Sequence, residues 1–336
     1  MGRIMQPNNA ASVPGISAIG GFKHELAFRW PLANPAAFAT YFAEEGYVVL
    51  RGAVPKELCG LAVAAFEREV RPSRAYFRRH ESSAFERHVF TEAGFMKYPI
   101  MNIQDLVESS FASFRQHGLD LLTQPSVRSA MAILLGEPGR MIHTMYFDGN
   151  QKTWAHRDCH YIDSEQTGRM IGVWVAAEDI HPGAGPFYVY ARSHRTPTPP
   201  ELALDQIDPN GAEYKQRIAE FAAGSSLRVA APELQCGDAL LWSSLTIHGS
   251  LATTAPDHSR RSFTAHYIPF SDASVGHHGT RSKEQRTLIN GVDVILHGDH
   301  SRTWLQTWTP VTRAHLQSRI PWLYRGLRAI KRHALG

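Results

Sequence analysis

The stretch "TWAHRDCHYI", residues 153–162, sets two histidines and an aspartate at alternate positions. If this stretch is a strand, His156, Asp158 and His160 project from one face, because alternate side chains of a strand point the same way. Imidazole and carboxylate groups are ligands for metal ions, so the stretch predicts a metal site. Taken alone, it also fits a buried imidazole whose hydrogen bond is satisfied by a carboxylate.

A second segment strengthens the metal hypothesis. "GDALLWSSLTIHGS", residues 237–250, places His248 directly after a predicted strand, and the adjacent Arg260 and Arg261 open the next strand, "RRSFTAHYIPF". Two imidazoles and one carboxylate form a facial triad that suits Fe(II) and leaves coordination positions open. A guanidinium group binds a carboxylate through two parallel hydrogen bonds. Together these groups fit 2-oxoglutarate, whose keto-acid end would chelate iron and whose far carboxylate would meet the arginine.

The surrounding pattern predicts a β-rich fold. From residue 140 onward, most of the short apolar segments are separated by Gly, Pro, Asn or Asp, which is typical of a sandwich or barrel. These strand-like segments are 140–147, 153–162, 169–178, 186–192, 226–230, 238–244 and 261–270. Helices are expected at 35–45, 56–70 and 126–135. Two long insertions are expected to be lids or binding loops: 196–225, which is Pro-rich and then helical, and 271–304.

Composition limits the class of protein. The chain has 336 residues, of which 43% are hydrophobic and 20% charged, and its three cysteines are widely spaced. This composition and cysteine usage predict a globular protein of a reducing compartment. The sequence has no apolar stretch typical of a signal peptide or a membrane span, so we expect a soluble, cytoplasmic protein. Nothing in it indicates a nucleic-acid partner.

Positive charge is concentrated at the C-terminal end. Residues 301–336 contain seven Lys or Arg and no Asp or Glu, together with several aromatic residues. Such a segment can contact an anionic membrane surface, or it can be a docked helix with solvated arginines. We therefore expect a loose segment at 1–20, a single domain at 21–300 with its β core near 140–270 and a lid insertion at 196–225, and a basic helical segment at 301–336.

These motifs together resemble the phytanoyl-CoA dioxygenase family of Fe(II)/2-oxoglutarate-dependent oxygenases. The resemblance runs from about residue 95 to 270, with a weaker match in "GYVVLRGAV" nearer the start. The matching features are "HRDCHY" at 156–161, Trp174, "HTM" at 143–145, the pair Gln104-Asp105, and the two segments that carry His248 and Arg260. The chain departs from the family at 191–194, where it has Ala-Arg-Ser-His instead of Pro-Gly-Ser-His.

The resemblance implies a mainly β fold with flanking helices (α+β), built on a cupin-like double-stranded β-helix, or jelly roll. It implies Fe(II) and 2-oxoglutarate as cofactors, O2 as co-substrate and ascorbate as an optional reductant. The implied iron ligands are His156, Asp158 and His248. The implied 2-oxoglutarate contacts are Arg260, with Arg261 as the alternative anchor, Trp174, Thr144 and Asn102. His160 is expected to lie beside the ligands rather than to be a fourth one.

The resemblance also bears on the reaction. Related halogenases have a small residue in place of the triad carboxylate, so the presence of Asp158 favours hydroxylation with release of succinate and CO2. Desaturation, epoxidation or ring formation with the same cofactors remains the alternative. A Zn(II) hydrolase and an inactive jelly-roll binding module are alternatives of another class. The basic cluster "RPSRAYFRRH", residues 71–80, suggests a small-molecule or lipid-like substrate that is anionic.

Overall fold

The computed structural model describes residues 27–80, 84–197, 211–276, 284–298, 302–303 and 322. The predictions for residues 1–20 and for most of residues 301–336 lie outside this part of the chain. Within it, no helix is both long and apolar enough to cross a membrane.

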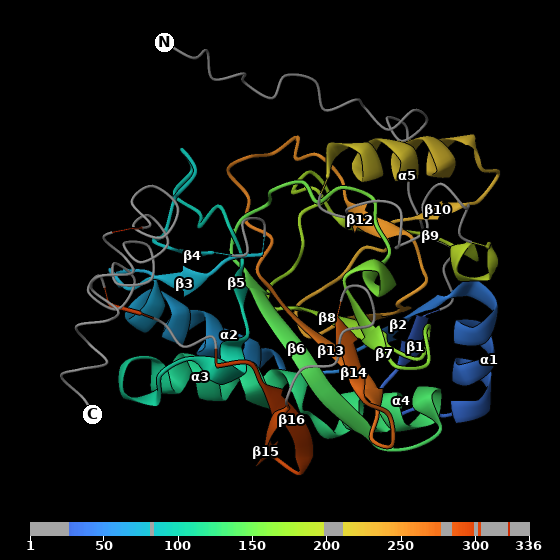
Figure 1. Ribbon diagram of the computed structural model, residues 1–336, viewed down its shortest axis with the longest axis horizontal. Helices are drawn as coiled ribbons and strands as arrows, with labels where there is room; N and C mark the ends of the chain where they lie inside the picture. The colour runs from blue at the N-terminus through green and yellow to red at the C-terminus, as the bar shows by residue number, and fades with distance from the viewer. Residues whose placement is uncertain are drawn as a thin grey trace.

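A large mixed sheet forms the centre of the molecule (Figure 1). Its order is β1-β2-β11-β8-β13-β6-β16-β15, and β5 also pairs with β6. Its strands are β1 (Ala27–Arg29), β2 (Tyr47–Arg51), β5 (Ile100–Met101), β6 (Gly139–Phe147), β8 (Ile171–Ala176), β11 (Ala239–Ser243), β13 (Ser262–Pro269), β15 (Gln285–Ile289) and β16 (Val292–Leu296).

A short antiparallel sheet, of order β10-β9-β12, lies above the long sheet in Figure 1. Its strands are β9 (Phe187–Tyr190), β10 (Val229–Ala230) and β12 (His248–Ser250). Two-stranded pairs join β14 (Ser274–Gly276) to β7 (Ile162–Ser164) and β3 (Phe77–Arg78) to β4 (Phe85–Glu86). The central strands alternate in the expected way: Leu241 and Val173 pack toward the helices, whereas Leu240 and Trp174 face the space between the sheets.

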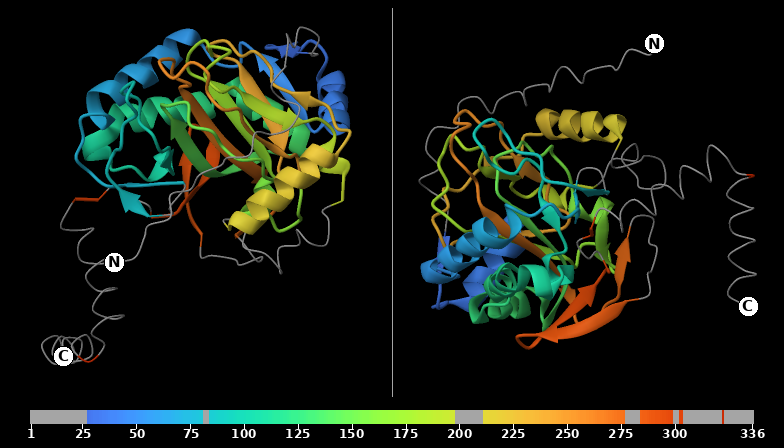
Figure 2. Two further views of the ribbon diagram at one scale, coloured as in Figure 1. Left: turned by 90° about the horizontal axis from the view of Figure 1, so that it is seen from above. Right: turned by 90° about the vertical axis from the view of Figure 1, so that its left-hand side faces the viewer.

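Helices cover the other face of the long sheet. They are α1 (Pro35–Glu45), α2 (Lys56–Ala65), which continues as a π-helix (Phe66–Val70), α3 (Glu108–Leu122) and α4 (Pro125–Leu135). Figure 2 shows α2 and α3 on one side of the sheet and α5 (Ala212–Gly224) on the opposite side. The three helices predicted at 35–45, 56–70 and 126–135 are confirmed, and α5 confirms the helical part of the first insertion. The Asn34 side chain accepts a hydrogen bond from the Ala37 amide (3.0 Å) to begin α1, and Gly46 ends this helix with φ of 79°.

Sequence analysis missed one helix, and two local predictions were wrong. Helix α3 was not predicted, because the segment is polar and contains Gly118; tertiary packing stabilises it by placing Phe114 and Leu121 in the core. The insertion 271–304 is not only a loop, since β15 and β16 form a hairpin whose second strand pairs with β6. The stretch 153–162 is not one strand. It makes a single β-bridge at His156 and then turns into a short 3-10 helix, Asp158–His160.

The departure from the family pattern at 191–194 has a visible structural consequence. Arg192 has φ of 68°, a left-handed conformation in which the family's glycine would be unstrained. Contacts with Glu45 hold Arg192 there: its Nε lies 2.7 Å from Glu45 Oε1, and its amide donates to the Glu45 carbonyl at 2.8 Å. An ion pair with α1 therefore fixes a turn that a glycine would adopt freely.

His88 gives the fold a pH dependence that can be measured. Burial and the adjacent Arg79 lower its pKa to about 4. The neutral ring accepts from Arg79 (2.9 Å) through Nδ1 and donates to the Val70 carbonyl (2.9 Å) through Nε2. The unfolded chain takes up this proton below about pH 6.5, whereas the folded protein does not, so stability decreases as the pH falls from about 6.5 to about 4. We expect protonation of His88 in the unfolded chain to lower the free energy of unfolding by about 3 kcal/mol between about pH 6.5 and about pH 4.

Urea unfolding of the wild type and His88→Gln at several pH values tests this expectation. The free energy of unfolding of the variant should change less between pH 6.5 and 4, because glutamine does not titrate. Parallel curves for the two proteins over this interval would contradict it.

Candidate active site

The two triad histidines are brought together by backbone pairing. His156 and His248 form an isolated antiparallel bridge in which each amide donates to the other residue's carbonyl at 3.0 Å. Directly paired residues of this kind have neighbouring side chains on one face. Their imidazole rings accordingly lie with centroids 4.3 Å apart. Residues 92 positions apart in the chain thus present two ring nitrogens to the same point.

Asp158 reaches the same point because the chain turns after His156. The 3-10 helix starts at Asp158, whose carbonyl accepts from the Tyr161 amide at 2.8 Å. Its Oδ1 lies 3.4 Å from Nε2 of His156 and 3.4 Å from Nε2 of His248. One ligand atom from each of the three buried residues lies within 4.8 Å of the others. The turn, rather than the strand alternation we expected, brings the carboxylate to the histidines.

The protonation of these groups fits a divalent metal. Nδ1 of His156 donates to the Trp154 carbonyl (2.8 Å), and Nδ1 of His248 donates to the Thr246 carbonyl (2.9 Å). Each ring therefore keeps its proton on Nδ1 and leaves the Nε2 lone pair available. Burial lowers the pKa of His156, which favours its neutral form. Burial alone would raise the pKa of Asp158, but the neighbouring His248 and His266 hold it well below the ordinary value.

The triad lies in a cavity of about 480 Å³, within the size range of small-molecule sites. Trp174 and Asn102, both expected to contact 2-oxoglutarate, line this cavity. Thr144 is not among its lining residues. The Thr144 hydroxyl is buried and engaged elsewhere, accepting from the Ile103 amide (2.8 Å) and donating to Gln104 (2.5 Å). The structure thus brings Trp174 and Asn102 to the triad but not Thr144.

Arg260 also lines the cavity, and only 3% of it is exposed. Its guanidinium donates to the carbonyls of Gly185 and Gln151, the latter at 2.8 Å. Burial lowers its pKa to about 10, so the group remains cationic at neutral pH. In the described part of the chain these contacts are with neutral carbonyls, not with a carboxylate. A buried cation of this kind is suited to an incoming anion.

Arg261, the alternative anchor, points to the other side of the chain. Its Nε lies 3.0 Å from Asp148 Oδ1, and its terminal nitrogen lies 2.6 Å from Glu67 Oε1. Its amide donates to Glu178 at 2.7 Å. Arg261 is therefore engaged in an ion-pair network and does not line the cavity.

Sequence reasoning missed two residues that contact Asp158. Trp242 Nε1 donates to Asp158 Oδ2 at 2.7 Å, and His266 Nε2 lies 3.3 Å from the same oxygen. Alternation along β13 could have placed His266 on the inner face, because it follows Arg260 by an even number of residues. No comparable signal marks Trp242, since only the pairing of β11 with β8 places its ring near the carboxylate.

His160 lies outside the cavity lining. Its Nδ1 is hydrogen-bonded to the hydroxyl of Tyr214 on α5, and both residues are buried. His160 therefore connects the metal-site turn to the helix of the first insertion, consistent with its not being a fourth ligand.

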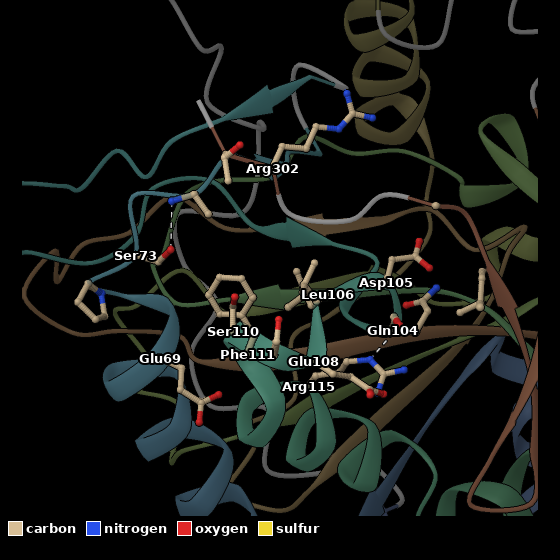
Figure 3. Close-up of a pocket in the computed structure, with 17 residues that line it drawn as sticks. Glu69, Ser73, Gln104, Asp105, Leu106, Glu108, Ser110, Phe111, Arg115 and Arg302 are labelled. Carbon is tan, nitrogen blue, oxygen red and sulfur yellow. Dashed lines mark hydrogen bonds and ion pairs between the residues drawn. The ribbon is translucent and has the colours of Figure 1, made fainter. Parts of the chain in front are cut away.

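A second, open groove of about 1180 Å³ lies near the start of α3 (Figure 3). Gln104 and Asp105, the pair that resembles a family motif, line this groove rather than the cavity of the triad. Two of its charged groups form an ion pair, since Arg115 lies 2.7 Å from Glu108. Arg115 also donates to the Gln104 carbonyl at 3.1 Å. We assign no function to the groove.

The fold and the triad define a class: jelly-roll oxygenases that use iron and 2-oxoglutarate. The profile of the family described as "Phytanoyl-CoA dioxygenase (PhyH)" matches residues 42–262, about two thirds of the chain. The chain belongs to this family, and it is an oxygenase dependent on Fe(II) and 2-oxoglutarate. No curated protein matches the sequence.

Several solved structures share the fold. The epimerase SnoN, in complex with Fe3+, alpha ketoglutarate and nogalamycin RO, is 19% identical, with a TM-score of 0.53 over 80% of this chain and 99% of that one. The carbocyclase SnoK from nogalamycin biosynthesis is 14% identical, with a TM-score of 0.51 over 73% and 87%. EctD from S. alaskensis, with 2-oxoglutarate and 5-hydroxyectoine, is 18% identical, with a TM-score of 0.51 over 76% and 87%. These likenesses confirm the predicted cupin-like jelly roll.

Proposed function

We propose that the protein hydroxylates an unactivated C–H bond of a small molecule and releases succinate and CO2. The observation that carries this proposal is the carboxylate of Asp158, whose Oδ1 lies 3.4 Å from Nε2 of each triad histidine. A retained carboxylate leaves no space at this position for a halide. Epimerisation, desaturation or ring formation would use the same cofactors, and the mass of the product distinguishes these outcomes from the addition of one oxygen atom. Epoxidation adds the same mass but requires a carbon–carbon double bond in the substrate.

In this proposal the chain's own residues bind and orient the reactants. His156, Asp158 and His248 would hold iron, which supplies the O2 chemistry with 2-oxoglutarate as the electron donor. Arg260 would bind the far carboxylate of 2-oxoglutarate, with Trp174 and Asn102 in the surrounding wall. The buried aromatic lining would exclude water from the reacting groups.

The cavity charge supports an anionic substrate with an apolar part. Among the described lining residues, the cations are Arg78, Lys152 and Arg260, and Asp158 is the carboxylate. Besides Arg260, which is assigned to 2-oxoglutarate, the lining contains the cations Arg78 and Lys152, whose positive charge attracts a phosphate or carboxylate. Aromatic residues such as Phe147 and Tyr161 offer apolar contact.

Two compounds that share an octyl group but differ in charge test the substrate class. Octyl phosphate should inhibit 2-oxoglutarate turnover more strongly than octanol does, and Arg78→Gln or Lys152→Gln should reduce this difference. Lys56→Gln, which changes an exposed lysine on α2, is the matched control. Equal inhibition by both compounds would contradict an anionic substrate.

We also propose a cytoplasmic location with peripheral contact to anionic membranes through the basic C-terminal segment. The support is its charge, seven Lys or Arg and no acidic residue within 301–336. Flotation with anionic liposomes should be weaker for a variant lacking residues 310–336. Equal flotation, or none, for both proteins would contradict it.

An oxygen-free titration with Fe(II) and then 2-oxoglutarate tests the main proposal. We expect a visible metal-to-ligand charge-transfer band, followed by succinate formation when O2 is admitted, with both absent in Asp158→Ala. Activity with Zn(II) and no 2-oxoglutarate would instead indicate the hydrolase. Absence of the band and of succinate would indicate a binding module.

A further inference from the structure

We infer that Trp242, given space by Gly172, is a positioning residue that makes Asp158 present one oxygen to the metal. The inference rests on the proposed function, because it requires the triad to hold a divalent ion. It concerns a residue to which the sequence motifs gave no role.

The position of Trp242 follows from strand register. Trp242 on β11 pairs with Gly172 on β8, which in turn pairs with His266 on β13. Paired residues of neighbouring strands lie on the same face of a sheet. Trp242, Gly172 and His266 therefore form a row across three strands, on the face that borders the cavity.

Gly172 provides the space that the indole occupies. A Cβ atom built on Gly172 would lie 2.3 Å from Cζ2 and 2.4 Å from Cε2 of Trp242. Real Cβ atoms do not approach so closely, so any other residue here would displace the ring. The indole therefore lies across β8, with its N–H directed at Asp158.

The two carboxylate oxygens of Asp158 have different neighbours. Trp242 donates to Oδ2 at 2.7 Å, and His266 lies 3.3 Å from the same atom. Oδ1 instead faces Nε2 of both triad histidines at 3.4 Å. The ring of Trp242 also contacts His248, with centroids 5.1 Å apart. One oxygen is held by the protein and the other faces the metal position, which keeps further coordination positions open.

The test measures Mn(II) binding, which requires no turnover. Trp242→Phe keeps an aromatic ring but removes the N–H donor. Loss of such a hydrogen bond to a ligand typically weakens metal affinity by roughly 10- to 100-fold, and we expect this increase in the Mn(II) dissociation constant. Trp30→Phe, the same substitution at a half-buried tryptophan outside the cavity, should leave Mn(II) affinity unchanged.

A second variant tests the role of the glycine. Gly172→Ala should weaken Mn(II) binding in the wild type but add little to Trp242→Phe, since phenylalanine lacks the indole atoms that a Cβ at position 172 would meet. Unchanged Mn(II) affinity in Trp242→Phe, or an equal loss of Mn(II) affinity in Trp30→Phe, would overturn the inference. Failure of the wild type to bind Mn(II) would overturn the proposed function itself.

Discussion

Replacement of His248 by alanine is expected to raise the dissociation constant for Fe(II) or Mn(II) by roughly 100- to 1000-fold. A structural zinc site of four ligands contributes about 10–16 kcal/mol, so one ligand accounts for about 2.5–4 kcal/mol, and about 1.4 kcal/mol corresponds to a factor of ten. His248 is 3% exposed, and its Nε2 lies 3.4 Å from Asp158 Oδ1. Calorimetric titration of the metal-free protein with Fe(II) or Mn(II) measures this change.

The matched control for this prediction is His181→Ala. His181 is an exposed histidine that stacks on His258 and does not line the cavity. The His181→Ala variant should bind the metal as tightly as the wild type. This result separates the loss of a metal ligand from a general effect of removing one of the 18 histidines. Wild-type affinity in His248→Ala would show that the metal is bound elsewhere.

Arg260→Ala is expected to weaken 2-oxoglutarate binding by a factor of about 100 or more. Removing one member of a buried ion pair costs about 3–5 kcal/mol, and a factor of ten corresponds to about 1.4 kcal/mol. The charge-transfer band should still form, but only at much higher 2-oxoglutarate concentration, because the keto-acid end would still bind iron. The measurement is an oxygen-free titration of the Fe(II) protein with 2-oxoglutarate.

Arg261→Ala is the matched control, since it removes the adjacent arginine from the opposite side of the chain. Its contacts with Asp148 (3.0 Å) and Glu67 (2.6 Å) predict a lower thermal midpoint and a nearly unchanged concentration of 2-oxoglutarate at half-saturation. The reverse result, with 2-oxoglutarate affinity lost in Arg261→Ala and kept in Arg260→Ala, would identify Arg261 as the anchor.

The sequence by itself determined the residue types of the site and the β-rich class of the fold. His156, Asp158, His248 and Arg260 could be found because their chemistry is specific and their spacing matches a known family. The helices at 35–45 and 126–135 were equally accessible, since a glycine ends each of them at a left-handed φ. These features depend on local sequence, which acts over a few residues.

Only the tertiary structure decided how these groups face one another. Local alternation predicted a single strand through Asp158. In the structure, this segment pairs with the distant His248 only at His156, and the chain turns immediately afterwards. The indole of Trp242 reaches Asp158 because strand pairing sets it opposite Gly172, a relation between residues 70 positions apart. Helix α3 likewise forms because the sheet covers its apolar side chains. Such contacts depend on register and packing between distant segments, which no local pattern of residues encodes.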